Sequence, residues 1–277
     1  MKSKAYACLI VIAILSIYSL AIIVPLLLGG QSVHPFLNPG VWIYALFSIV
    51  SIVVVLNREI TSLDLLIASA ICAVVGITSL LFIRDSATFL MAFFVNGIPA
   101  GICYLGGCAL LRSTKLTHIR FIEKDWKKGT ESISLGILFS IPWAILNILL
   151  IRGSGSTDAF MKGELWRALA AIQPGISEEI MFRLFLLTAC FSLLSHYLAK
   201  RSAVLVSVFL SAFIHGYIHV APILLSNPIL AMVQGFVISV IFILPMAYLY
   251  LKRDLETAIS FHFFVDFVRF IYAYSVL

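Results

Sequence analysis

Long runs of apolar residues, separated by short polar segments, dominate the pattern along the chain. A helix needs about 20 predominantly apolar residues to cross the roughly 30 Å hydrocarbon core of a bilayer. Nine stretches are candidates by this measure: 5–28, 41–56, 63–83, 88–111, 132–151, 174–198, 202–222, 229–250 and 256–276. The pattern predicts an all-α fold, a polytopic transmembrane helical bundle, because the segments of a membrane β-barrel are shorter and alternate.

We expect eight or nine spans, because three of the nine runs are irregular. The run 41–56 is short, and the run 174–198 begins late, after Pro174-Gly175. The last run, 256–276, contains charged and titratable residues, which makes it an unusual membrane helix.

Composition supports a membrane protein. Hydrophobic residues make up 62% of the 277 residues and charged residues only 12%. A soluble domain carries about 25% charged residues, so the composition excludes a soluble globular protein.

The basic residues predict how the chain is oriented. With nine spans and a cytoplasmic N-terminus, thirteen Lys and Arg residues lie on the inner side and four on the outer side, a bias that the positive-inside rule favours. The inner residues are Lys2, Lys4, Arg58, Arg112, Lys115, Arg120, Lys124, Lys127, Lys128, Lys200, Arg201, Lys252 and Arg253. This topology signal also explains the net charge of +6, so we do not expect a nucleic-acid partner.

Titratable residues within apolar runs are concentrated in the last hundred or so residues. A charge in the bilayer costs at least ~2.5–3.5 kcal/mol, so such residues usually pair with each other or line a cavity. We therefore divide the chain into an N-terminal scaffold, residues 1–165, and a core, residues 166–277, that carries the candidate chemistry. The scaffold has about five spans and a basic cytoplasmic loop at 112–131, and the core has about four spans.

The first polar group is Glu178-Glu179 with Arg183. Helical spacing of i,i+4 places Glu179 and Arg183 on one face, where they can form an ion pair. Glu178 points about 100° away and has no partner on its own helix. A salt-bridged helix start is the alternative, but inside an apolar span the pattern favours a fixed Glu179 and a Glu178 that can act as a general base.

The second group is His215 and His219, which share a helix face at i,i+4. This spacing can also offer two imidazoles to a metal ion, with a third ligand from Glu178 or His262. The alternative is one packed core histidine and one interfacial histidine near Pro222.

The third group is His262 and Asp266, again at i,i+4, with Arg269 three residues further on. An Asp beside a His can fix its tautomer. A structural group of mutually neutralising charges is the alternative. Polar pairs on three separate late spans favour a shared site.

Together these residues resemble a water-activating hydrolase. Glu178 would take a proton from water, a histidine would assist, and other polar groups would bind the oxyanion that forms on an amide carbonyl. This chemistry predicts hydrolysis of a peptide bond. A nucleophilic serine is less favoured, because no G-x-S-x-G elbow occurs and Ser177 and Ser211 have no assigned base.

A simple topology places the groups at different depths. Counted at ~1.5 Å per residue from the basic residues that mark the inner face, His215 and Asp266 lie about 21 Å above it and Glu178 about 33 Å. A shared site therefore requires a tilted helix, irregular backbone near Pro174-Gly175, or a cavity open to water.

At these positions the sequence resembles the CAAX protease and bacteriocin-processing family of intramembrane proteases, which includes the Ras-converting CAAX endopeptidase. The family patterns are E-E-x-x-x-R, F-x-x-x-H and H-x-x-x-N or H-x-x-x-D, on successive membrane helices. The chain matches the first at Glu178-Glu179 and the third at His262. The second is imperfect, because Ser211 stands four residues before His215 and His215 stands four before His219. The local sequence Ala-Phe-Ile-His-Gly favours His215. The likeness covers roughly residues 165–277.

The resemblance implies an intramembrane endopeptidase. Its catalytic residues would be Glu178, Glu179, Arg183, His215, His262 and Asp266. Glu178 and His215 would activate water, and His262 and Asp266 would help to form the oxyanion site. Glu179 and Arg183 would orient the first helix. We favour a mechanism that requires no cofactor, with zinc or another divalent metal as the open alternative, although the better zinc signature, H-E-x-x-H, is absent.

The expected partners are a membrane-associated protein or peptide substrate and the lipid bilayer. The expected location is the cell membrane of a prokaryote, as a multi-pass protein with a cytoplasmic N-terminus. One alternative is a non-catalytic membrane protein of the same fold, such as a bacteriocin-immunity or scaffold factor. A proton-coupled transporter is another, since intramembrane Glu, His and Asp form proton relays, but no clear inverted repeat supports it.

Overall fold

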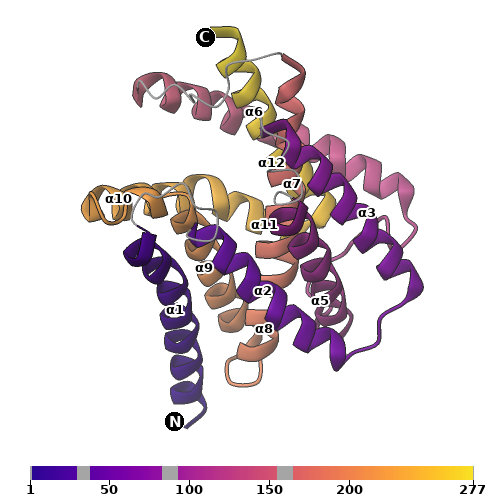
Figure 1. Ribbon diagram of the computed structural model, residues 1–277. Helices are drawn as coiled ribbons and strands as arrows, with labels where there is room; N and C mark the ends of the chain where they lie inside the picture. Colours follow the sequence, from indigo (N-terminus) through magenta and orange to yellow (C-terminus); the bar gives the residue numbers. More distant parts are fainter. Residues whose placement is uncertain (1, 30–37, 83–92, 155–164, 277) are drawn as a thin grey trace.

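The computed structural model describes residues 2–29, 38–82, 93–154 and 165–276, and the regular structure in these ranges is entirely helical (Figure 1). In chain order the elements are α1 (Lys2–Gly29), α2 (Pro39–Leu56), α3 (Ser62–Ser79), η2 (Leu80–Phe82), η4 (Phe93–Gly97), α5 (Ile98–Thr114), α6 (Trp126–Ser154), η6 (Leu165–Ala171), α7 (Ile172–Glu178), η7 (Glu179–Leu187), α8 (Thr188–Leu194), α9 (Lys200–Ile218), η8 (Ala221–Ile223), α10 (Pro228–Ile238), η9 (Ser239–Ile243), α11 (Leu244–Lys252) and α12 (Leu255–Val276). Each of the nine predicted runs corresponds to helical structure, except that residues 83 and 88–92 lie outside the described ranges. The all-α fold class is confirmed.

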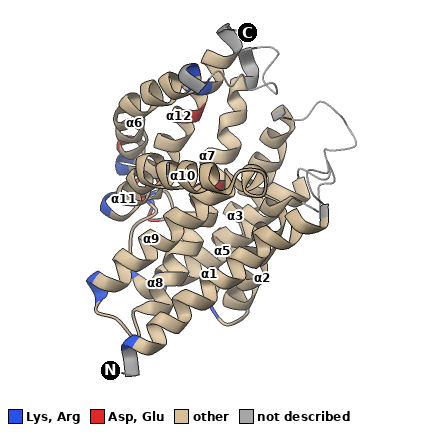
Figure 2. Ribbon diagram, turned by 90° about the vertical axis from the view of Figure 1, so that its left-hand side faces the viewer, with Lys and Arg blue, Asp and Glu red and all other residues tan. Residues whose placement is uncertain are grey.

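Seven helical segments in the described part of the chain are long and apolar enough to cross a membrane: Lys4–Leu28, Pro39–Leu56, Ser62–Ser79, Phe93–Thr114, Trp126–Arg152, Lys200–Ile218 and Pro228–Lys252. They indicate an integral, multi-pass membrane protein. The other two predicted spans are also helical, but one is divided into α7, η7 and α8, and the other is the polar α12. Figure 2 shows Lys and Arg mainly at helix ends, with few charged residues in the middle of helices.

α7, η7 and α8 follow one another without a break from Ile172 to Leu194, and we call this segment the central helix. Its middle part, η7, is a π-helix whose nine residues are all buried. α2, α5, α9 and α12 pack around η7. Gly107 of α5 permits one close contact, because a Cβ atom there would lie 2.6 Å from Cγ of Leu184.

α12 packs against α6, α7 and α11. It comes closest to α7 at Gly175, where a Cβ atom would lie 3.0 Å from Cα of Phe263. This glycine therefore brings the start of the central helix within side-chain reach of the middle of α12. α6 and α12 form the most extensive helix pair, so contacts cross the proposed border between residues 1–165 and 166–277, and that division stays a prediction.

The basic loop expected at 112–131 is shorter in the structure, because α5 extends to Thr114 and α6 begins at Trp126. Asp125 explains the earlier start of α6. Its carboxylate accepts a hydrogen bond from the backbone N of Lys128 at 3.2 Å and lies 2.9 Å from Nζ of the same residue. An acceptor at this position satisfies one of the free N–H groups of the first helical turn.

Asp254 ties this loop to α6 and to the start of α12. Its Oδ2 accepts hydrogen bonds from Arg120 Nε at 3.2 Å and Ser132 Oγ at 2.6 Å, and its Oδ1 accepts one from Thr257 N at 3.0 Å. Burial raises the pKa of the Asp254 carboxyl, but the hydrogen bonds from Ser132, Thr257 and Arg120 outweigh burial and hold the pKa below its usual value. Asp254 thereby fixes where α12 begins.

Candidate active site

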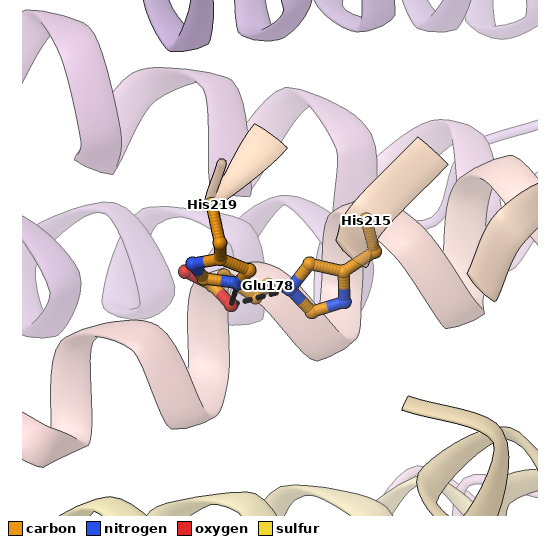
Figure 3. Close-up of side chains that lie close together, drawn as sticks. All are labelled: Glu178, His215 and His219. Atoms are coloured by element: carbon orange, nitrogen blue, oxygen red, sulfur yellow. Dashed lines mark hydrogen bonds and ion pairs between the residues drawn. The ribbon is translucent and has the colours of Figure 1, made fainter. Parts of the chain in front are cut away.

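The carboxylate of Glu178, the last residue of α7, lies among three histidines. Its Oε2 is 2.6 Å from Nε2 of His215, 3.7 Å from Nε2 of His219 and 3.7 Å from Nε2 of His262. Figure 3 shows Glu178 pointing toward the two histidines of α9, while His262 comes from α12. Three helices that are distant in sequence therefore converge on one carboxylate oxygen.

Glu178 and His215 lie at similar depths in the bundle because the central helix ends earlier than the sequence pattern implied. It stops at Leu194, and residues 195–199 form a turn before α9. Glu178 is 194 − 178 = 16 residues from the end of its helix, and His215 is 215 − 200 = 15 residues from the start of α9. At ~1.5 Å per residue these positions are about 24 Å and 22 Å from the same turn, so no large tilt is required.

Arg183 holds two of the site residues at once. Its Nη1 lies 3.1 Å from Oε1 of Glu179 and donates a hydrogen bond to Nδ1 of His215 at 2.6 Å. The predicted Glu179–Arg183 ion pair is confirmed, and both side chains are fully buried. Nη2 of Arg183 points to the opposite side, toward Sδ of Met246 at 3.2 Å. The guanidinium therefore connects η7 with α9 and α11.

The contact with Arg183 fixes the tautomer of His215. A guanidinium can only donate, so Nδ1 of His215 must accept and the ring proton must be on Nε2. Nε2 then donates to Glu178 across 2.6 Å. Burial of this chain of donors strengthens the arrangement, since no water competes for either nitrogen.

His262 lies between carboxylates. Its Nδ1 is 2.8 Å from Oε1 of Glu179, and its Nε2 is 3.4 Å from Oδ2 of Asp266. Arg269 Nη1 lies 4.0 Å from the other oxygen of Asp266. The predicted His262–Asp266 pair is therefore present, and the structure joins it to Glu179 on the central helix. Both ring nitrogens face acceptors, an arrangement that suits an imidazole with N–H donors on both sides.

Comparison with known protein families bears on the same part of the chain. Residues 162–268 match the model of the family described as type II CAAX prenyl endopeptidase Rce1-like. We call this matched part of the chain the Rce1-like domain. They include every residue of the site, from Glu178 to Asp266, which agrees with the resemblance seen in the sequence. No curated protein and no solved structure matches the chain.

Within the Rce1-like domain, the two candidate histidines of α9 differ in their surroundings. His215 is fully buried and its ring stacks on that of Phe182, with centroids 4.2 Å apart and planes at 2°. The side chain of His219 is 42% exposed and lies at the end of α9. The shorter contact and the fixed orientation support His215 for the catalytic position, and that assignment stays a prediction.

Two residues that hold this geometry were not identified from the sequence. Phe182 supplies the ring under His215, and the Ser211 hydroxyl donates to the carbonyl oxygen of Phe182 at 2.6 Å. A π-helix shifts backbone hydrogen bonds from i,i+4 to i,i+5, and Ser211 of α9 supplies a donor within η7. Ser211 occupies the place where the family pattern has Phe, so this departure from the pattern was the available signal.

The hydroxyl groups of the serines near the site face backbone carbonyls. Ser177 Oγ donates to the carbonyl of Gln173 at 2.8 Å, and Ser211 Oγ donates to Phe182. Neither hydroxyl bonds to a histidine in the described part of the chain, so neither has the base that a nucleophilic serine needs.

Glu178, His215 and His219 could be considered as a metal site, because one ligand atom from each lies within 4.8 Å of the others. The ion would need Nε2 of His215, since Nδ1 accepts from Arg183. That Nε2 carries a proton as long as Arg183 stays in place, and a protonated nitrogen cannot coordinate a metal. The three residues therefore do not fit a divalent ion unless the Arg183–His215 contact is lost.

Proposed function

We propose that this protein is an intramembrane endopeptidase that hydrolyses a peptide bond with water activated by Glu178. The observation that carries the proposal is the convergence of Glu178, His215 and His262, from three helices, within 2.6–3.7 Å. Burying a charge within a membrane protein costs free energy. A carboxylate partly surrounded by imidazoles is therefore more typical of a functional site than of a helical bundle with a purely structural role. Membership of residues 162–268 in the Rce1-like family supports a protease.

In the proposed mechanism Glu178 is the general base. It takes a proton from water as the water oxygen attacks the carbonyl carbon of the scissile bond. The bond from carbon to nitrogen then breaks, and the proton passes from Glu178 to the leaving nitrogen. Nε2–H of His215 donates a hydrogen bond to Glu178, with the proton staying on the imidazole, and so keeps the carboxylate ionised and oriented.

The negative charge that develops on the carbonyl oxygen needs a hydrogen-bond donor. His262 supplies the N–H of its Nε2, which would turn from its 3.4 Å contact with Asp266 to the oxyanion, while Glu179 holds the ring through Nδ1. A single donor of this kind contributes about 10²–10³ to the rate in other hydrolases. Arg183 acts on the reaction only through Glu179 and His215, so it is a positioning residue.

We further propose that the substrate is a membrane-associated protein or peptide and that the reaction requires no cofactor. The charge bias places the N-terminus in the cytoplasm, and we propose the cell membrane of a prokaryote as the location. The description of the matching family contains the words CAAX prenyl endopeptidase, so a farnesylated CAAX peptide is the first probe to use.

The experiment is cleavage of this peptide, with and without its farnesyl group, by the purified protein in detergent, followed by mass spectrometry of the products. We expect one internal cut that a chelator does not slow. Added hydroxylamine should give no hydroxamate product, because no acyl-enzyme forms. Loss of cleavage with chelator would indicate a metal, and a hydroxamate would indicate a nucleophilic side chain. The non-catalytic alternative is favoured if no peptide is cut and a Glu178→Ala variant retains the cellular phenotype.

A further inference from the structure

A polar pocket of about 430 Å³ lies far from the proposed active site, where the ends of α2, α5 and α8 meet the start of α9. Its basic residues are Arg58, His196 and Lys200, and Phe191 forms an apolar wall. Four hydroxyl residues complete the lining: Ser113, Thr114, Ser192 and Ser195. None of the described residues that line the pocket is acidic.

The positive charge in this pocket is not balanced locally. Among the described residues, Arg112 pairs with Asp64, Lys128 with Asp125 and Arg253 with Glu131, yet Arg58, His196 and Lys200 form no ion pair. Nδ1 of His196 donates to the carbonyl oxygen of Ser192 at 2.7 Å, so the cationic groups left to meet an anion are Arg58 and Lys200. The hydroxyls of Ser113, Thr114 and Ser195 donate to backbone carbonyls. The two cationic side chains Arg58 and Lys200, with the Ser192 hydroxyl beside them, are complementary to an anion with several oxygen acceptors.

The pocket also lies at the depth of lipid headgroups. Figures 1 and 2 place the turn between α8 and α9 at the same end of the bundle as the N-terminus. Beside it the rings of Tyr6 and Tyr197 are in contact, with centroids 5.9 Å apart and both side chains partly exposed, as is typical of aromatic residues at a membrane surface. The charge bias assigns this end to the cytoplasmic leaflet, where anionic phospholipids collect.

We propose that this pocket binds a phosphate group, and that an anionic phospholipid of the cytoplasmic leaflet carries it. Arg58, which lies just past the end of α2, and Lys200, the first residue of α9, neutralise the phosphate, and the Ser192 hydroxyl donates to one of its oxygens. Phe191 contacts the apolar part of the lipid. The lipid thereby links the scaffold helices α2 and α5 to the α8–α9 turn of the Rce1-like domain. This inference does not depend on peptide hydrolysis.

The test is lipid binding by native mass spectrometry, with phosphatidylglycerol compared with phosphatidylcholine. The variant carries Arg58→Gln and Lys200→Gln. The matched control carries Lys124→Gln and Lys127→Gln, which remove the same charge from exposed positions at the end of the basic loop and the start of α6, outside this pocket. Each basic residue near a membrane surface contributes to the binding of anionic lipid, and we expect the loss of two to weaken phosphatidylglycerol binding about thirtyfold. Thermal unfolding in phosphatidylcholine nanodiscs is the check that both variants are folded.

We expect wild type and control to bind phosphatidylglycerol equally and the pocket variant to bind it about thirtyfold more weakly. Equal phosphatidylglycerol binding by all three proteins would overturn the site. Inorganic phosphate forms a separate arm. If free phosphate stabilises wild type as strongly as the lipid does, and the pocket variant loses this effect, the phosphate site stands and its lipid source is wrong.

Discussion

α1 and the central helix are both long helices, but they meet different surroundings. Only 17% of the apolar window of α1 is buried within the bundle, and large side chains such as Leu20 and Leu27 face outward. All nine residues of η7 are buried, including Glu179 and Arg183. A helix that faces lipid needs an apolar surface and little else, whereas a helix enclosed by others can carry charge when its neighbours supply the partners.

The comparison predicts its largest difference for Arg183. Changing Arg183→Met leaves buried Glu179 with only His262 as a partner and removes the donor to Nδ1 of His215, and we expect a loss of about 3–5 kcal/mol in stability. Changing Leu20→Ala on α1 should cost less than about 0.5 kcal/mol, because the side chain faces lipid. Thermal unfolding of both variants in nanodiscs measures the difference. Similar melting temperatures would show that Arg183 is not essential to the enclosed helix.

Asp254, at the start of α12, is a second buried charge whose neighbours supply its partners. Because the pKa of this carboxyl is lower in the folded state, its contribution to stability is present above the unfolded pKa of about 3.9 and is lost as the pH falls through the folded value. We expect Asp254→Asn to cost about 1–3 kcal/mol at neutral pH and to weaken the loss of stability below about pH 4.

Melting temperatures measured from pH 7 to pH 3 test this prediction. Glu131→Gln is the matched control, because Glu131 forms an exposed pair with Arg253 on the same side of the bundle. Parallel pH curves for the wild type and Asp254→Asn would contradict the assigned role of Asp254.

The close crossing at Gly175 should respond to added volume. Gly175→Val places side-chain atoms against the backbone of Phe263, so we expect a loss of about 1–3 kcal/mol and slower cleavage as His262 moves away from Glu178. Ala13→Val on the exposed face of α1 adds comparable volume in lipid and should leave both quantities unchanged. Wild-type cleavage by Gly175→Val would show that the crossing does not set the site geometry.

The smallest effect is expected for the ring that stacks on His215. Phe182→Leu keeps the position apolar but removes the stack, which is worth about 0.5–1.5 kcal/mol and corresponds to a loss of about two- to twelvefold in kcat. Phe209→Leu is the control, since Phe209 also stacks on an aromatic ring but is exposed. Equal kcat values for the two variants would show that the stack of Phe182 on His215 does not contribute to the rate.

The sequence predicted contacts within helices better than contacts between them. The Glu179–Arg183 and His262–Asp266 pairs follow from i,i+4 spacing, and both are present. The contact of Arg183 with His215 joins residues 32 positions apart, and it depends on the π-helical turns and on how closely α9 packs against η7. No periodicity in the chain encodes that distance.

Helix existence was also easier to predict than helix ends. Apolar runs place the spans, but the end of α8 at Leu194 depends on a turn whose residues, 195–199, do not differ sharply from those of a helix. That turn removed the apparent mismatch in depth between Glu178 and His215. The start of α6 at Trp126 depends likewise on a single hydrogen bond to Asp125.

The most direct test of the central claim is the turnover of a peptide substrate by Glu178→Gln. This change keeps the shape of the side chain and its capacity to accept from His215 but removes the base, so we expect cleavage to fall by at least about 100-fold while the melting temperature stays close to that of wild type. Glu123→Gln, on the basic loop, should retain full turnover. Cleavage at the wild-type rate by folded Glu178→Gln would contradict the proposal that this carboxylate activates water.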